Sequence, residues 1–195
     1  WRSLMHHDSA WFGKSGAAAA AENVLLYQCA IGGWPKNIDM ARTLTPAEKE
    51  RLTTPPPDSE ATIDNGATWT QLAFLARVIS ARPEPRFIQA FNRGLDYLFA
   101  AQYSNGGWPQ FFPLHPGYFS HITFNDDAMT GVLTLLHEIA AGEAHTRFVD
   151  DGRREKSAAA VERGIRCILA TQLKEGEKRT AWCAQYDEKS LEPAP

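Results

Sequence analysis

The stretch Tyr27–Asn37, YQCAIGGWPKN, decides the fold, because a closely similar string, AQYSNGGWPQF, returns at 101–111. In both strings a glutamine is followed, after three residues, by Gly-Gly-Trp-Pro. Glycine supplies the positive backbone angles that end a helix, and proline keeps the helix from resuming. A weaker copy at 171–185, TQLKEGEKRTAWCAQ, has four extra residues and lacks Gly-Gly. Trp34, Trp108 and Trp182 are separated by 74 residues in each interval.

Each copy of this turn follows a segment with the period of an amphipathic helix. Apolar residues spaced by three and four predict helices at 17–30, 86–102 and 157–172. The second of these has the clearest apolar stripe, formed by Phe87, Phe91, Leu95, Leu98 and Phe99.

A second element repeats within each period. The string TIDNGA at 62–67 aligns with TFNDDA at 123–128, and each precedes an apolar run. Asp and Asn accept backbone N–H groups at helix starts, so both strings are expected at helix N-termini. Self-similarity at this length predicts stacked helical hairpins. We therefore expect an all-α fold, an (α/α) toroid of about three helical hairpins with little or no β structure, forming one domain over residues 1–195.

Two segments between the predicted helices lack a periodic pattern. The segment 41–60 contains four prolines and is expected to be a structureless rim loop or a mobile insertion. The charged segment 150–156 is expected to be a turn.

Composition excludes some functions. The 195 residues are 44% hydrophobic and 22% charged, which is typical of a globular chain. The net charge of −3 argues against a general nucleic-acid binder. The chain has no run of 18 apolar residues that would predict a membrane span and no signal-peptide pattern at its start. Cys29, Cys167 and Cys183 have no metal-binding spacing; one disulfide pair or three buried thiols are both open.

The two Asx clusters are candidates for a metal site. Asp64, Asn65, Asn125, Asp126 and Asp127 can all be helix caps and nothing more. However, there are more carboxylates than two caps need, and closing a ring of repeats turns both clusters toward one face. Carboxylate and amide oxygens gathered in this way suit a hard cation such as calcium.

Several polar and aromatic residues near these clusters are candidates for ligand contacts. Lys36 and Gln110 occupy the same position after Trp-Pro, and a lysine is a point charge suited to a carboxylate. Trp108 can close its turn against the core, and Tyr118 and His121 can likewise be structural. Asp187 and Glu188 hold the third position on this rim. The sequence has none of the common nucleotide, zinc-protease or serine-hydrolase motifs.

These strings resemble one family closely, the pectate lyases of polysaccharide lyase family 10. The segments that carry the resemblance lie between residues 23 and 195, and GGWPKN at 32–37 followed by NDDAM at 125–129 is its most specific part. The resemblance implies an (α/α) toroid with a long groove, a monomer that is secreted or periplasmic, and β-elimination cleavage of polygalacturonate. It implies calcium as the cofactor.

The resemblance also implies roles for single residues. Asp64 and Asp126 match the calcium-contacting, catalytic aspartates of the family, and Asn65 lies beside the first. The groove-lining strings contain the residues expected to bind substrate: Lys36, Trp108, Gln110, Tyr118 and His121. A cation on the galacturonate carboxylate stabilises the charge that develops when the adjacent proton is removed.

The catalytic base that the family implies is an arginine after the WCAQ string, and here no arginine follows Arg179. We therefore expect a domain truncated at its C-terminus, with the base beyond Pro195. The first alternative is a non-catalytic galacturonan-binding fragment that uses the same groove and calcium. The second is an isoprenoid cyclase-like toroid, because Gln-x3-Gly-x-Trp resembles the repeats of those enzymes, an argument from fold alone.

Overall fold

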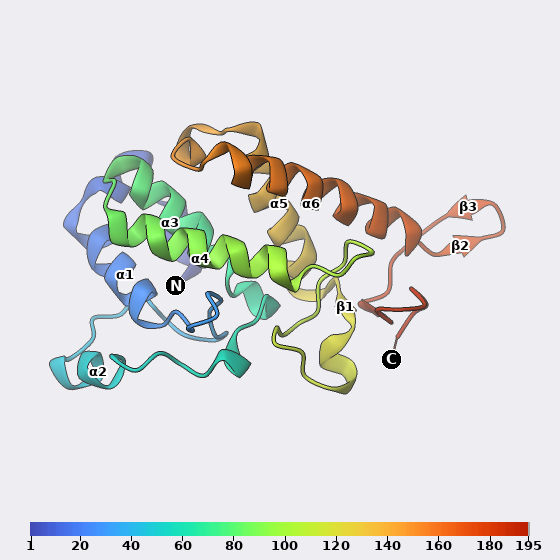
Figure 1. The fold of residues 1–195 in the computed structure, drawn as a ribbon, viewed down its shortest axis with the longest axis horizontal. Helices are drawn as coiled ribbons and strands as arrows, with labels where there is room; N and C mark the ends of the chain where they lie inside the picture. The colour runs from blue at the N-terminus through green and yellow to red at the C-terminus, as the bar shows by residue number, and fades with distance from the viewer. Residues whose placement is uncertain (195) are drawn as a thin grey trace.

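The computed structural model describes residues 1–194, which are mostly helical (Figure 1). The α-helices are α1 (Ser15–Leu26), α2 (Pro46–Arg51), α3 (Trp69–Ala81), α4 (Pro85–Ala101), α5 (Ala128–Ala141) and α6 (Asp151–Ala170). The 3-10 helices are η1 (Arg2–His6), η2 (Ser9–Gly13), η3 (Asp58–Glu60), η4 (Asp64–Gly66), η5 (Gly117–Ser120), η6 (Asn125–Asp127) and η7 (Ala144–Thr146). The strands are β1 (Ile122–Thr123), β2 (Lys174–Glu175), β3 (Lys178–Arg179) and β4 (Gln185–Tyr186). The predicted all-α class is confirmed.

The long helices form two layers. Helices α3 and α5 contact each other, and α1, α4 and α6 are the helices that run into the three tryptophan turns (Figure 1). The hairpins α3–α4 and α5–α6 are complete. In the first repeat only α1 is a full helix, and the short η1 and η2 pack on α3. The expected three hairpins are therefore two hairpins and a single helix within residues 1–194.

The tryptophan turns repeat in atomic detail. The indole N–H groups of Trp34, Trp108 and Trp182 donate to backbone carbonyls of the preceding helices at 2.7, 2.8 and 2.7 Å. In each copy the accepting residue lies four positions before the repeated glutamine; the acceptors are Val24, Leu98 and Ile168. The glutamine amide N–H in turn donates to the carbonyl two residues before the tryptophan. The third copy is thus a true repeat.

The two Asx strings, residues 62–67 and 123–128, connect neighbouring tryptophan turns. Thr62 donates its backbone N–H to Trp34 O at 3.2 Å, and the next residue donates to Gln110 O at 3.0 Å. In the following repeat Thr123 donates to Trp108 O at 3.2 Å, and the next residue donates to Ala184 O at 2.8 Å. Each Asx string is therefore fastened between two successive tryptophan turns, which places the turns and the Asx strings on one side of the helical layers.

Extended structure is confined to short pieces, as predicted. Strands β1 and β4 pair antiparallel, and isolated bridges join the turns to the Asx strings. The other pair, β2 and β3, is a hairpin with Gly176 at a φ of 62°. This hairpin holds the four extra residues of the third turn, so the insertion leaves the hydrogen bond of Trp182 intact.

Two expectations about irregular segments are wrong. The segment 41–60 contains α2, which begins with Thr45 and Glu48 capping each other's backbone N–H groups. The segment 150–156 is the start of α6, with Asp150 as the N-cap that accepts from Arg153 N at 2.9 Å. In both places a short polar side chain supplies the acceptor that an apolar pattern does not reveal.

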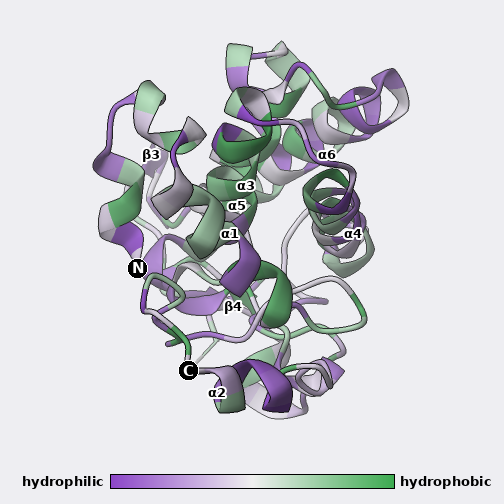
Figure 2. Cartoon of the chain, turned by 90° about the vertical axis from the view of Figure 1, so that its left-hand side faces the viewer, coloured by the Kyte–Doolittle hydropathy of each residue, from purple (hydrophilic) through white to green (hydrophobic). Residues whose placement is uncertain are grey.

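The core lies between the two helical layers. Helices α3 and α5 bury most of their residues, whereas α4 and α6 carry polar outer faces (Figure 2). Cys29 and Cys167 are buried free thiols, and burial raises their pKa values to about 12 and about 11, so both stay protonated. Cys183 is free and half-buried. No helix among residues 1–194 has the length and apolar character needed to cross a membrane.

Candidate functional site

The two Asx strings adopt the same unusual backbone conformation. Asn65 has φ 50° and ψ 29°, and the equivalent Asp126 has φ 55° and ψ 32°. The residues that follow them, Gly66 and Asp127, also have positive φ. Left-handed geometry favours Gly, Asn and Asp, which explains why these residue types occupy the positive-φ positions of both strings. The short helices η4 and η6 contact each other, so the repeat brings the two strings together.

An open cleft of about 440 Å³ lies over the two strings. Polar side chains dominate its lining. The residues that line it are Trp1, Arg2, Pro35, Lys36, Asn37, Ile38, Asn65, Gly66, Ala67, Thr70, Gln71, Asp126 and Asp127. Of the candidates named from sequence, Lys36, Asn65, Asp126 and Asp127 share this cleft. Residues from the first tryptophan turn and from both Asx strings therefore meet at one place.

Asp64 is buried beneath Lys36. The lysine Nζ lies 2.6 Å from Asp64 Oδ2, with side-chain exposures of 30% and 7%. The other carboxylate oxygen, Oδ1, is buried and has no hydrogen-bond partner among residues 1–194. A buried carboxylate oxygen without a donor is unfavourable, because the energy of its lost hydration is not recovered. Oδ1 is therefore the oxygen of this carboxylate that the described residues leave unpaired.

The asparagine side chains of the site are oriented by hydrogen bonds to neighbouring polar side chains. Asn65 Nδ2 donates to Asn37 Oδ1 at 3.1 Å, which ties the first Asx string to the first tryptophan turn. In the second string, Asn125 Nδ2 donates to Asp126 Oδ2 at 3.0 Å. Asn125 Oδ1 in turn accepts from the Thr123 hydroxyl at 2.5 Å. These bonds orient carboxylate and amide oxygens without consuming them all.

Arg2 is a cleft residue that sequence reasoning missed. Its guanidinium lies 6.0 Å from the Trp69 ring centroid and close to Gly66, where an added Cβ would meet it. The cleft therefore has two basic side chains, Arg2 and Lys36. No signal in the pattern pointed to Arg2, because it belongs to the short N-terminal helix η1, outside the repeat.

Two of the expected substrate contacts need correction. Trp108 is fully buried, and its indole closes the turn on α4. Gln110 is 1% exposed, and its amide donates to the Tyr118 hydroxyl at 2.9 Å. Neither side chain reaches the surface, so both support the site from beneath. The polarity of Gln110 serves the contact with Tyr118.

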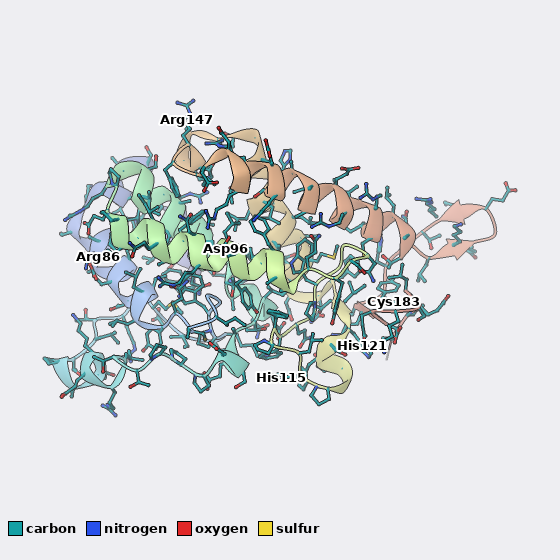
Figure 3. All side chains as sticks on the ribbon, viewed as in Figure 1. Arg86, Asp96, His115, His121, Arg147 and Cys183 are labelled. Carbon is teal, nitrogen blue, oxygen red and sulfur yellow. The ribbon has the colours of Figure 1, made fainter. Side chains whose placement is uncertain are left out.

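Tyr118 and His121 are not among the lining residues of the cleft; they belong to the segment of the chain that connects α4 to α5, where Figure 3 labels His121. Tyr118 is half-exposed, as expected for a residue that can touch a ligand. His121 Nδ1 is 3.3 Å from Glu188 Oε2, and Asp187 completes a cluster whose potential ligand atoms lie within 4.8 Å of one another. One oxygen of the Asp187 carboxylate, Oδ1, accepts from the backbone N–H groups of Lys189 and Ser190.

Comparisons with known proteins agree with this arrangement. The family model described as "Pectic acid lyase" matches residues 28–195. Two structures of a family 10 polysaccharide lyase from Cellvibrio cellulosa, one a mutant in complex with trigalacturonic acid, match with a TM-score of 0.81 and 34% identity. They cover 93% and 94% of this chain but 54% and 55% of the other, so the chain spans about half the length of those proteins. Among curated proteins no sequence matches.

The fold and these matches define the class of protein: a mostly helical chain related to the polysaccharide lyases. The chain belongs to the pectic acid lyase family, polysaccharide lyase family 10, which confirms the resemblance found in its motifs.

Proposed function

We propose that this chain binds polygalacturonate with the help of calcium and forms part of a pectate lyase that cleaves the polymer by β-elimination. The observation that carries the proposal is that the buried Asp64 Oδ1 has no hydrogen-bond donor among the described residues. The next residue, Asn65, lines a cleft together with Asp126. The relative crystallised with trigalacturonic acid supports the choice of ligand.

The donor set fits a calcium ion. Calcium takes six to eight oxygen ligands, from carboxylates, amide carbonyls and water. Asp64, Asn65 and Asp126 supply these oxygen types, and their backbone geometry is fixed by the repeat. When bound, calcium neutralises a uronate carboxylate and so increases the acidity of the adjacent carbon-bound proton.

Basic side chains complete the binding surface for an acidic polymer. Lys36 and Arg2 line the same cleft as Asp126, although the chain as a whole is slightly acidic. The Lys36 ammonium is also 5.3 Å from the Phe111 ring centroid, which holds the side chain toward the second turn. We propose that these two cations pair with uronate carboxylates and so set the position of the sugar rings. Tyr118 and His121 extend this contact beyond the cleft.

The base that removes the proton is the unassigned part of the reaction. The family implies an arginine after the WCAQ string, and Arg179, the last arginine of the sequence, lies exposed on β3. The second candidate function is therefore galacturonan binding without cleavage by residues 1–195. It is favoured by the described lining of the cleft, in which the arginine is Arg2 of η1 and not a residue after the WCAQ string.

Calcium binding is tested by titration calorimetry on the wild type, Asp126→Asn and Asp127→Asn. Asparagine tolerates the left-handed backbone of both positions, so the two variants are matched for strain. We expect Asp126→Asn to weaken calcium binding by at least ten-fold, and the effect of Asp127→Asn shows whether Asp127, which lines the same cleft, is a further ligand. Equal affinity in the wild type and Asp126→Asn would remove Asp126 from the site.

Cleavage is tested separately from binding. Polygalacturonate is incubated with calcium and excess protein, and the absorbance of unsaturated product is followed alongside binding of trigalacturonate. Binding with product formation supports the lyase, and binding without product supports the second candidate. Absence of binding with and without calcium rejects both.

A further inference from the structure

The repeated glutamine and tryptophan form a cassette that receives a helix. We define cassette 1 as residues 28–34, cassette 2 as 102–108 and cassette 3 as 172–182. In cassette 1 the Gln28 amide donates to Ala90 O of α4 at 2.8 Å, and its carbonyl accepts from the Arg93 guanidinium. In cassette 2 the Gln102 amide donates to an α6 carbonyl at 2.9 Å, and its carbonyl accepts from an α6 guanidinium.

The two received helices share a short sequence. Helix α4 carries Ala90-Phe-Asn-Arg-Gly94, and α6 carries Ala160-Val-Glu-Arg-Gly164, so the common pattern is Ala-x-x-Arg-Gly. Each element of the pattern has a contact. The alanine carbonyl and the arginine guanidinium bond to the glutamine, and the final glycine lies against the tryptophan ring, where an added Cβ would come within 2.6 Å of Trp34 and 3.3 Å of Trp108.

Cassette 3 has the same internal structure. Leu173 N donates to Ala181 O at 2.9 Å, as Cys29 N does to Gly33 O at 2.9 Å and Tyr103 N to Gly107 O at 2.8 Å. The indole of Trp182 is tied to Ile168 O in the same way as in the other copies. Cassette 3 therefore has the same internal hydrogen bonds as the two cassettes that bind a helix.

Within residues 1–194 no helix covers cassette 3. Trp182 is 42% exposed, whereas Trp34 and Trp108 are 0% exposed. Ile165 lies three residues before Ile168, whose carbonyl accepts from Trp182, and is 49% exposed, whereas its equivalents Ala21 and Leu95 are 0% exposed. Leu169, one helical turn after Ile165 on α6, is 47% exposed, and the Trp182 indole is bonded to the neighbouring Ile168 carbonyl, so these three side chains form one exposed apolar face. Such a face marks an interaction site.

We propose that cassette 3 is a binding site for an α-helix with the sequence Ala-x-x-Arg-Gly, read by Gln172 and Trp182. The helix comes from the same protein, from polypeptide outside residues 1–195. The internal repeat predicts the sequence pattern of this helix. This chain covers about half of the matched structures, so proteins of this kind contain further polypeptide that can provide such a helix. The inference does not depend on calcium or galacturonan.

The chemistry is tested with a fluorescein-labelled peptide that copies Asp151–Ala170 with Cys167→Ser. Two control peptides carry Arg163→Met or Gly164→Leu. The receptor is residues 1–195, either wild type or with Gln172→Leu, and fluorescence anisotropy gives the dissociation constant. Lys178→Ala, on the exposed β3, is the matched receptor control.

We expect Gln172→Leu and the Arg163→Met peptide each to weaken binding by at least ten-fold, and their combination to lose no more than either alone, because both remove the same hydrogen bond. The Gly164→Leu peptide is expected to bind weakly to every receptor. No binding of the parent peptide, or binding that is insensitive to both changes, overturns the proposal.

The source of the helix is tested by labelling. Ile165→Cys in a Cys183→Ser background is treated with maleimide in residues 1–195 and in the protein extended beyond residue 195. We expect labelling at least ten-fold slower in the extended protein. Equal rates overturn the assignment to the same protein, as does a dimer of residues 1–195 in sedimentation that Leu169→Glu dissociates, because the occupant is then a second copy.

Discussion

The Lys36 ammonium lies 2.6 Å from Asp64 Oδ2 and leaves the buried Oδ1 of the same carboxylate without a partner. Lysine is a single point of charge and satisfies one oxygen, whereas a cation bound from the cleft would satisfy the other. The pair therefore stabilises the site when no metal is present.

The first prediction concerns this pair. We expect Lys36→Met to lower the free energy of unfolding by roughly 2–3 kcal/mol, somewhat below the value for a fully buried pair, since Lys36 keeps part of its exposure. If Asp64 binds calcium, the ion will recover more stability in Lys36→Met than in the wild type. Thermal unfolding with calcium and with a chelator measures both effects. Lys36→Arg is the control, and an equal calcium shift in all three proteins argues against Asp64 as a ligand.

The second prediction uses the repeat. Trp108→Phe removes an indole N–H from a fully buried site and orphans the Leu98 carbonyl, so we expect a loss of about 2–4 kcal/mol. Trp182→Phe removes the equivalent bond where the ring is 42% exposed, and water can replace the lost donor, so we expect about 1 kcal/mol. Urea unfolding of the two variants compares them. Equal losses would show that exposure does not govern the cost.

The third prediction concerns two glycines with positive φ, Gly106 in the second tryptophan turn and Gly176 in the β2–β3 hairpin. A Cβ at Gly106, where φ is +96°, would lie 2.1 Å from the Arg163 carbonyl oxygen. We therefore expect Gly106→Ala to cost about 3 kcal/mol or more, from backbone strain together with a clash that separates the turn from α6. At Gly176 φ is +62° but nothing lies within 4 Å, so Gly176→Ala is expected to cost about 1 kcal/mol. Chemical denaturation measures both, and a similar cost for the two variants would contradict the clash.

These glycines also show what the sequence reveals. Gly-Gly-Trp-Pro is a local signal, because the positive φ and the helix stop are properties of the residues themselves, so the turns and their helices were predictable. The capping pair of Thr45 and Glu48 is likewise local, but α2 has only six residues and no apolar stripe. The start of α6 was missed because its first turn is charged and its N-cap lies within the same charged run.

The candidate site was only partly predictable for a different reason. The residue types of the Asx strings and their repetition indicate a site. The burial of Gln110 and the place of Arg2 depend on how distant segments pack, since Arg2 reaches the cleft from a helix outside the repeat. A sequence pattern predicts which residues lie near the site, but it does not show which of their side chains are exposed to the cleft.

The last prediction concerns the pH dependence of α6. Asp150 accepts from the Arg153 guanidinium at 2.8 Å and from the Arg153 backbone N–H at 2.9 Å, and these bonds hold the pKa of its carboxyl below the usual value. A lowered pKa in the folded protein means that the stabilisation is present above the unfolded pKa, near 4, and is lost as the pH falls through the folded pKa. We expect Asp150→Ala to cost about 1–2 kcal/mol at pH 7, as a lost N-cap does. Asp150→Asn keeps a capping acceptor without the charge, so its smaller deficit should shrink as the pH falls below 4. Urea unfolding from pH 7 to pH 3 measures this, and a deficit that stays constant over that range would mean that the charge of Asp150 contributes nothing to α6.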